Sequence, residues 1–135
     1  LCAEISKASR AYTINLAGQT DLKQLLLTLK KAQLVIAPDS GPAHMAVTQN
    51  TPVIGLYAHS NPKRTGPYLY QRFTADAYTA IATKELHCEP EGIPWGYRLK
   101  GANLMQQITV EQVQNLIEQA IEFYGLEQPL SESPD

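Results

Sequence analysis

The chain has 135 residues, which is enough for one domain with a hydrophobic core. A hydrophobic fraction of 44% and a charged fraction of 18% are typical of a globular protein and exclude a largely disordered one. The net charge of −2 argues against a broad nucleic-acid-binding surface, and the apolar runs are too short to form a transmembrane segment.

The first part of the chain predicts one strand and one helix. Residues 12–16 alternate in polarity and are rich in β-forming side chains, so they predict a strand that ends at a turn over Ala17 and Gly18. Residues 22–31 predict an amphipathic helix, because their leucines recur at the spacing of one helical face. Thr20 and Asp21 precede this helix and offer an N-cap and a carboxylate in the first turn.

Two more strands follow, with a helix between them. Residues 33–37 and 52–57 are apolar and predict strands. Pro42 begins a helix that runs to residue 49, because its missing N–H has no consequence in the first helical turn. Alternating strands and helices imply parallel pairing with right-handed crossovers. The predicted fold class is therefore α/β, a Rossmann-like three-layer αβα arrangement around a parallel sheet.

The next part of the chain is less regular. Residues 58–70 have no hydrophobic period and predict a loop, and residues 78–83 predict a further strand. Residues 84–108 are rich in Gly and Pro and predict a long loop that packs on the domain. We expect a buried Trp95 to anchor this loop to the core.

The chain ends with a predicted helix and a tail. Residues 110–124 carry apolar side chains at helical spacing; Thr109 begins a capping-box pattern before them, and Gly125 stops the helix. Residues 129–135 predict a disordered tail, which leaves residues 1–128 as one domain. Because the chain begins without Met, we expect it to be a fragment of a longer protein.

The most informative segment is the turn after the second predicted strand, which contains Asp39, Ser40, Gly41, Pro42 and His44. In an open α/β sheet this turn lies at the carboxyl ends of the strands, where ligands bind, and the following helix favours an anion at its N-terminus. Gly41 lets the backbone approach a pyrophosphate closely. Ser40 and His44 can donate hydrogen bonds to its oxygens, and Asp39 can accept from sugar or ribose hydroxyls. The turn predicts a site for a phosphorylated or hydroxyl-rich ligand.

These residues also have ordinary structural interpretations. Asp39 can be a helix N-cap, Gly41 a turn residue with positive φ, and His44 a structural histidine. A hydrolytic Ser-His-Asp triad is disfavoured, because Ser40 lacks the flanking glycines of a nucleophile elbow and three members on one turn do not converge on one nucleophile.

Other candidate residues lie in nearby turns. Lys63 and Arg64 follow the third predicted strand and can offset phosphate charge, although they also fit a solvated basic loop. Thr20 can donate to a phosphate or cap a helix. Cys88 follows a histidine directly, and this pair lacks the spacing of a zinc site. The chain contains no Asp-x-Asp pair, so we expect neither a metal nor another cofactor.

Four motifs, in this order, resemble one known family. They are Asn15-Leu16-Ala17-Gly18-x-Thr20, Asp39-Ser40-Gly41-Pro42-x-His44-x-Ala46, Thr51-Pro52-Val53-Ile54-Gly55-Leu56-Tyr57 and Arg64-Thr65-Gly66-Pro67-Tyr68. Over about residues 12–124 the chain resembles the carboxyl-terminal, donor-binding half of the ADP-heptose:lipopolysaccharide heptosyltransferases, glycosyltransferase family 9. The resemblance implies one half of a two-domain GT-B enzyme, with Asp39, Ser40, Gly41 and His44 at the nucleotide-sugar site.

The activity that the resemblance implies is transfer of heptose from ADP-heptose to the lipopolysaccharide core or a related acceptor. The general base would then come from an amino-terminal domain outside this chain, so the chain alone is expected to bind the donor without transferring it. We expect a cytoplasmic location, in peripheral contact with the inner membrane. Two alternatives stay open: a non-catalytic nucleotide- or phospho-sugar-binding module, and half of a sugar-nucleotide epimerase.

Overall fold

The computed structural model describes residues 1–127, so the tail predicted at residues 129–135 lies outside the described residues. Within the described part, one parallel sheet has the strand order β1-β2-β3. Its strands are β1 (Val35–Pro38), β2 (Val53–Tyr57) and β3 (Thr74–Asp76). Pro38 at the end of β1 is aligned with Leu56 of β2. The carboxyl ends of these two strands therefore lie side by side.

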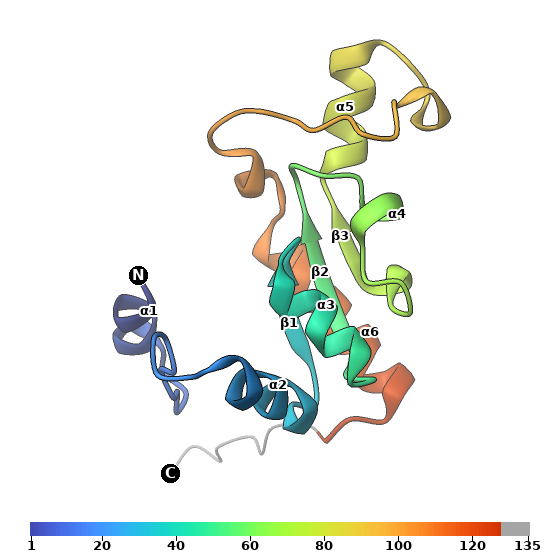
Figure 1. Ribbon diagram of the computed structural model, residues 1–135. Coiled ribbons are helices and arrows are strands. Elements are labelled where there is room, and N and C mark those ends of the chain that lie inside the picture. The colour runs from blue at the N-terminus through green and yellow to red at the C-terminus, as the bar shows by residue number, and fades with distance from the viewer. Residues whose placement is uncertain (128–135) are drawn as a thin grey trace.

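Helices precede, connect and follow the strands (Figure 1). The α-helices are α1 (Cys2–Ala8), α2 (Leu22–Lys31), α3 (Gly41–Thr48), α4 (Pro62–Thr65), α5 (Tyr78–Leu86) and α6 (Val110–Tyr124). Short 3-10 helices occupy Gln71–Phe73, Pro90–Gly92 and Leu104–Gln107. The helices predicted from apolar spacing before β1 and at the end of the chain are confirmed, and so is the helix predicted from Pro42 after β1.

The two faces of β2 are covered by different helices. Val53 packs in one apolar cluster with Leu29 of α2 and Ala43 of α3, and Ile54 packs in another with Ala120 of α6. Successive side chains of a strand point to opposite faces, so a strand buried on both faces is apolar throughout. Figure 1 shows α3 and α6 on opposite sides of the sheet. This arrangement confirms the Rossmann-like α/β fold.

The strand predicted at residues 12–16 is absent from the structure, where this segment is irregular. Tyr12 is 91% exposed and Ile14 is 68% exposed. A strand forms only when a neighbour satisfies its backbone N–H and C=O groups. Among the described residues, β1 pairs with β2 and does not pair with this segment. The strand predicted from the alternating polarity of residues 12–16 is therefore wrong, because this segment has no partner strand among the described residues.

Hydrogen bonds decide which residue caps α2. The side chain of Asp21 accepts from the Gln24 N–H at 2.8 Å, and the Gln24 side chain accepts from the Asp21 N–H at 2.8 Å. These two bonds form a capping box, so the prediction of Thr20 as N-cap is wrong. At α6 the predicted N-cap and helix end are confirmed: Thr109 Oγ1 accepts the Gln112 N–H at 3.1 Å, and Gly125 ends the helix with φ 60°. The capping box predicted there is only half formed, because the bond from the Gln112 side chain back to Thr109 is not among those of the described residues.

Residues 78–83, predicted as a strand, belong to α5, and the third strand of the sheet comes just before them. Tyr78 and Ala82 are both fully buried and lie one helical turn apart. The Asp76 carboxylate accepts from the Thr79 N–H at 2.8 Å and so satisfies a donor in the first turn. The β-forming Tyr, Thr and Ile side chains of this segment concealed its helical spacing.

Residues 84–108 are a loop only in part, because α5 extends to Leu86 and two 3-10 helices follow. The segment packs on the domain, as predicted, but not through Trp95, which is 66% exposed. Its apolar anchors are Ile93 and Leu99, which are 8% and 4% exposed and pack in one cluster with buried residues of α5. Figure 1 shows the segment leaving α5, crossing beside the sheet and returning to α6.

Candidate functional site

Asp39 is the centre of a polar cluster at the carboxyl end of the sheet. It follows β1 directly, just before α3. Its Oδ2 atom accepts a hydrogen bond from the Ser60 hydroxyl at 2.6 Å and another from the Thr65 hydroxyl at 3.0 Å. Ser60 follows β2 and Thr65 ends α4, so the pairing of β1 with β2 brings the three side chains together.

Two basic side chains approach the same carboxylate. The Nε2 atom of His44, in the first turn of α3, lies 3.6 Å from Asp39 Oδ1. The Nη2 atom of Arg98, from the segment before α6, lies 3.7 Å from Asp39 Oδ2. The Asp39 side chain is 20% exposed, whereas His44 and Arg98 are 53% and 62% exposed. The cluster therefore has a largely buried carboxylate, and its two basic side chains lie toward solvent.

Asp39 is not the N-cap of α3, although the sequence allowed that interpretation. The N-cap position is held by Ser40, whose side chain makes no capping bond to the helix. Its hydroxyl instead donates to the Pro38 carbonyl at 3.0 Å. Since the Asp39 carboxylate accepts from residues far along the chain, its contacts fix the site rather than the end of the helix.

The N-terminus of α3 is open at Gly41. Gly41 is exposed, and its φ is not among the positive values found at Gly18 and Gly125. A Cβ added to Gly41 would meet no heavy atom within 4 Å. The interpretation of Gly41 as a positive-φ turn residue is therefore wrong. Pro42 occupies the first turn, where it lacks an N–H that α3 does not need.

Tyr57 is a buried residue that holds part of the Asp39 cluster in place. It is 1% exposed, and its hydroxyl donates to the Thr65 carbonyl at 3.0 Å. Burial, together with the negative charge of Asp39, raises the pKa of Tyr57 to about 12. The phenol is therefore neutral near pH 7 and keeps its proton for the hydrogen bond that positions Thr65.

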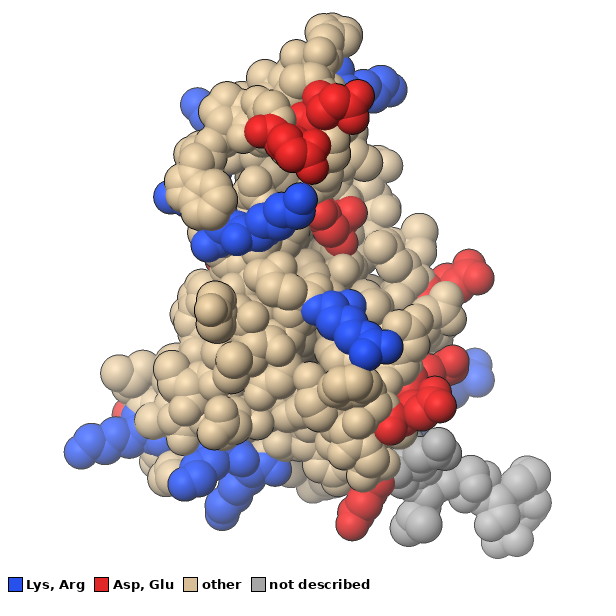
Figure 2. Space-filling view, turned by 90° about the vertical axis from the view of Figure 1, so that its right-hand side faces the viewer, with Lys and Arg blue, Asp and Glu red and all other residues tan. Residues whose placement is uncertain are grey.

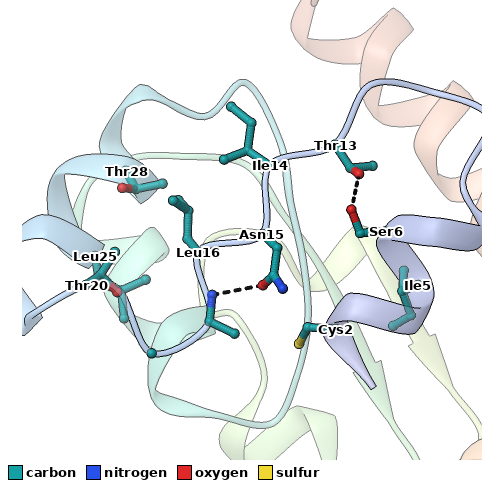
Figure 3. A pocket seen from close by; sticks show the side chains of 12 residues that line it. Cys2, Ile5, Ser6, Thr13, Ile14, Asn15, Leu16, Thr20, Leu25 and Thr28 are labelled. Atoms are coloured by element: carbon teal, nitrogen blue, oxygen red, sulfur yellow. Dashed lines mark hydrogen bonds between the residues drawn. The ribbon is translucent and has the colours of Figure 1, made fainter.

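The other predicted residues lie at two places. Lys63 and Arg64 are exposed on α4, next to Thr65, and the structure does not pair either with Asp39 in the described residues. Thr20 lines a different pocket of about 550 Å³ between α1 and α2. Figure 3 shows that this pocket is built by α1, α2 and the irregular segment between them, with Leu25 and Thr20 close together on the α2 side.

A small cavity of about 110 Å³ adjoins Asp39. It is lined by Pro38, Asp39, Leu56, Ala58, His59, Ser60, Arg98 and Met105. Sequence reasoning missed Ser60, Thr65 and Arg98. Hydroxyl residues after β2 were a usable signal for the first two, because neighbouring parallel strands end at the same edge. For Arg98 the sequence held no such signal, since its position depends on an irregular segment.

The face of the molecule shown in Figure 2 carries no single large patch of one charge. Figure 2 shows Lys and Arg mixed with Asp and Glu over one face of the molecule. In residues 1–127, no group of three or more His, Cys, Asp and Glu side chains is arranged to hold a metal ion. Within the same residues, every helix is too short or too polar to cross a membrane.

Comparison with known proteins points in one direction. The model of glycosyltransferase family 9 (heptosyltransferase) matches residues 2–93. The chain is 52% identical over 99 residues to the lipopolysaccharide core heptosyltransferase OpsX of Haemophilus influenzae. The matched residues make up 73% of this chain and 28% of that protein.

Two more distant relatives carry similar names. The chain is 33% identical over 67 residues to lipopolysaccharide heptosyltransferase 2 of Escherichia coli, covering 50% of this chain and 19% of the relative. It is 37% identical over 65 residues to lipooligosaccharide heptosyltransferase 2 of Haemophilus ducreyi, covering 47% of this chain and 19% of the relative. The chain thus spans less than a third of the length of these relatives. No solved structure matches it.

Proposed function

Because the chain belongs to glycosyltransferase family 9, we propose that it forms the donor-binding part of an enzyme that transfers heptose from ADP-heptose to the lipopolysaccharide core or a related acceptor. The relatives named for heptose transfer to lipopolysaccharide or lipooligosaccharide support this substrate class. The observation that carries the proposal is the position of Asp39 beside the open N-terminus of α3, at the carboxyl end of a parallel sheet.

In this proposal Asp39 and α3 recognise different parts of the donor. Two hydroxyls already donate to Asp39 Oδ2, so Oδ1 is the oxygen that accepts from a sugar or ribose hydroxyl. The diphosphate lies at the N-terminus of α3, where helix N–H groups and the helix dipole favour an anion. His44 donates from the same turn, and Ser40 donates once its hydroxyl turns from the Pro38 carbonyl to the ligand. The absent side chain of Gly41 leaves room for the phosphate oxygens.

The same groups would then assist the transfer itself. Negative charge develops on the departing diphosphate as its bond to the sugar breaks. The N-terminus of α3 stabilises this charge, together with Lys63 and Arg64 of α4. Thr20 is assigned to the same donor, from the pocket between α1 and α2.

The remaining parts of the proposal concern the whole protein. Residues 1–128 serve as the nucleotide-sugar-binding domain, and the general base comes from a second domain outside this chain. The lipopolysaccharide acceptor is a membrane lipid, so we place the enzyme in the cytoplasm, in peripheral contact with the inner membrane. On this assignment the chain by itself binds the donor nucleotide without catalysing transfer.

A nucleotide panel tests the proposal. Isothermal titration of the chain with ADP, UDP, GDP and CMP should give binding that is strongest for ADP and weak, with a dissociation constant on the order of 1 mM, because only part of the enzyme is present. The complete protein should bind ADP more tightly and transfer heptose. Absence of binding to all four nucleotides at several millimolar, in chain and complete protein alike, would contradict the donor-site assignment.

A further inference from the structure

A diphosphate bound beside Asp39 requires a cation that offsets this carboxylate. Among the residues that the structure describes, Asp39 forms ion pairs with His44 and Arg98. His44 is charged only when it is protonated, whereas a guanidinium is charged at every physiological pH. Arg98 is therefore the permanent cation of the cluster.

The backbone on both sides of Arg98 is held in place. The Tyr97 carbonyl accepts a hydrogen bond from the buried Tyr78 hydroxyl at 2.8 Å. The Leu99 N–H donates to the His59 carbonyl at 3.0 Å, and the Leu99 side chain is 4% exposed. Arg98 thus extends from an anchored segment and reaches the carboxyl end of the sheet from a position far along the chain.

The contact with Asp39 leaves most donors of the guanidinium free for a ligand. The distance from Arg98 Nη2 to Asp39 Oδ2 is 3.7 Å, which is longer than a hydrogen bond. That oxygen already accepts from the hydroxyls of Ser60 and Thr65. The Arg98 side chain is 62% exposed and lines the cavity beside Asp39. A guanidinium in this state can bind two phosphate oxygens at once.

We propose that Arg98 binds the diphosphate of the nucleotide-sugar donor and of the nucleoside diphosphate product. This inference rests on the proposed donor site and adds a residue to it. Arg98 lies beyond residues 2–93, the part of the chain that the family model matches. Its role differs from that of the α4 residues Lys63 and Arg64, because Arg98 acts directly beside the Asp39 carboxylate and compensates its charge.

The first experiment titrates ADP and adenosine into the complete protein that contains this chain. Arg98→Ala should weaken ADP binding at least tenfold and leave adenosine binding within twofold, since adenosine has no phosphate. Arg98→Lys should restore part of the loss, because it keeps the charge without the planar pair of donors. Lys100→Ala is the matched control: it removes the same charge from the same exposed segment and should leave ADP binding unchanged.

The second experiment separates phosphate binding from support of Asp39. Asp39→Asn keeps an oxygen that accepts from Ser60 and Thr65 but removes the negative charge. If Arg98 contacts the diphosphate, Arg98→Ala still weakens ADP binding about tenfold in the Asp39→Asn background. If the loss disappears in that background, Arg98 acts only through Asp39, and the inference is overturned.

The two proposals fail in different ways. A wild-type protein that binds ADP, with an Arg98→Ala variant that binds it equally well, overturns the role of Arg98 and leaves the donor site standing. A wild-type protein that binds none of ADP, UDP, GDP and CMP overturns both. Thermal melting of each variant checks that it is folded, which the exposure of Arg98 leads us to expect.

Discussion

At the scale of the residue, Gly41 is the position where folding and ligand binding are best separated. It begins α3 in an open environment, with no positive φ and no neighbour that a Cβ would touch. The fold therefore does not require glycine there. The remaining reason for glycine is a close approach by something outside the chain, which in the proposed site is a phosphate group.

Substitution of Gly41 should reduce binding without reducing stability. We expect Gly41→Ala to weaken ADP binding and Gly41→Val to abolish it, while the melting temperatures of both variants stay close to that of the wild type. Gly125→Ala is the opposite control. Its φ of 60° makes a side chain strained, so it should lower stability by about 1 kcal/mol and leave the affinity of folded molecules unchanged.

Paired melting curves and ADP titrations check these expectations. An unchanged ADP affinity in Gly41→Val would show that the diphosphate does not bind at the N-terminus of α3. A large loss of stability in Gly41→Ala would mean that the turn itself needs glycine.

At the scale of the element, the sequence predicted what depends on local chemistry. The helices α2 and α6, the strands β1 and β2, and the turn that contains Asp39 all followed from apolar spacing and helix-end residues. Long-range contacts were not predictable in the same way. Residues 12–16 have the alternation of a strand but no partner, and Arg98 reaches Asp39 only because Leu99 and Tyr97 are anchored elsewhere.

The capping box of α2 gives a test of local structure away from Asp39. Asp21→Ala should destabilise the protein by about 0.5–2 kcal/mol, because the Gln24 N–H loses its acceptor. Asp21→Asn keeps a side-chain oxygen and should change stability much less. Denaturant unfolding measures both, and ADP affinity should be the same in the two variants. A Thr20→Ala variant that is as unstable as Asp21→Ala would contradict the assignment of the cap.

At the scale of the whole molecule, a buried phenol links the site to the core. Tyr57 is the last residue of β2, is 1% exposed and bonds to the Thr65 carbonyl. Its pKa is raised from 10.0 to about 12, mainly by burial and further by the charge of Asp39. A raised pKa in the folded state means that folding favours the protonated phenol. This stabilisation is complete below pH 10 and is lost as the pH rises from about 10 to 12.

Alkaline unfolding should therefore depend on Tyr57. A shift of two pKa units corresponds to about 3 kcal/mol, so the free energy of unfolding should fall by up to this amount between pH 10 and 12 through Tyr57 alone. Tyr57→Phe should lose about 1 kcal/mol at pH 7, because one hydrogen bond is missing, and should then fall less steeply at high pH. Urea unfolding at several pH values measures both slopes. Equal slopes would show that the phenol does not titrate with unfolding.

The hydrogen bond between Leu99 and His59 has a consequence for the free energy of ligand binding. It joins positions 40 residues apart and fixes the backbone beside Arg98 before any ligand arrives. A free loop would have to be immobilised at the moment of association, and that loss of entropy would subtract from the affinity. Here the immobilisation occurs during folding. For a nucleotide held by Arg98, the site is preorganised, and residues that never touch the nucleotide help to set how tightly it binds.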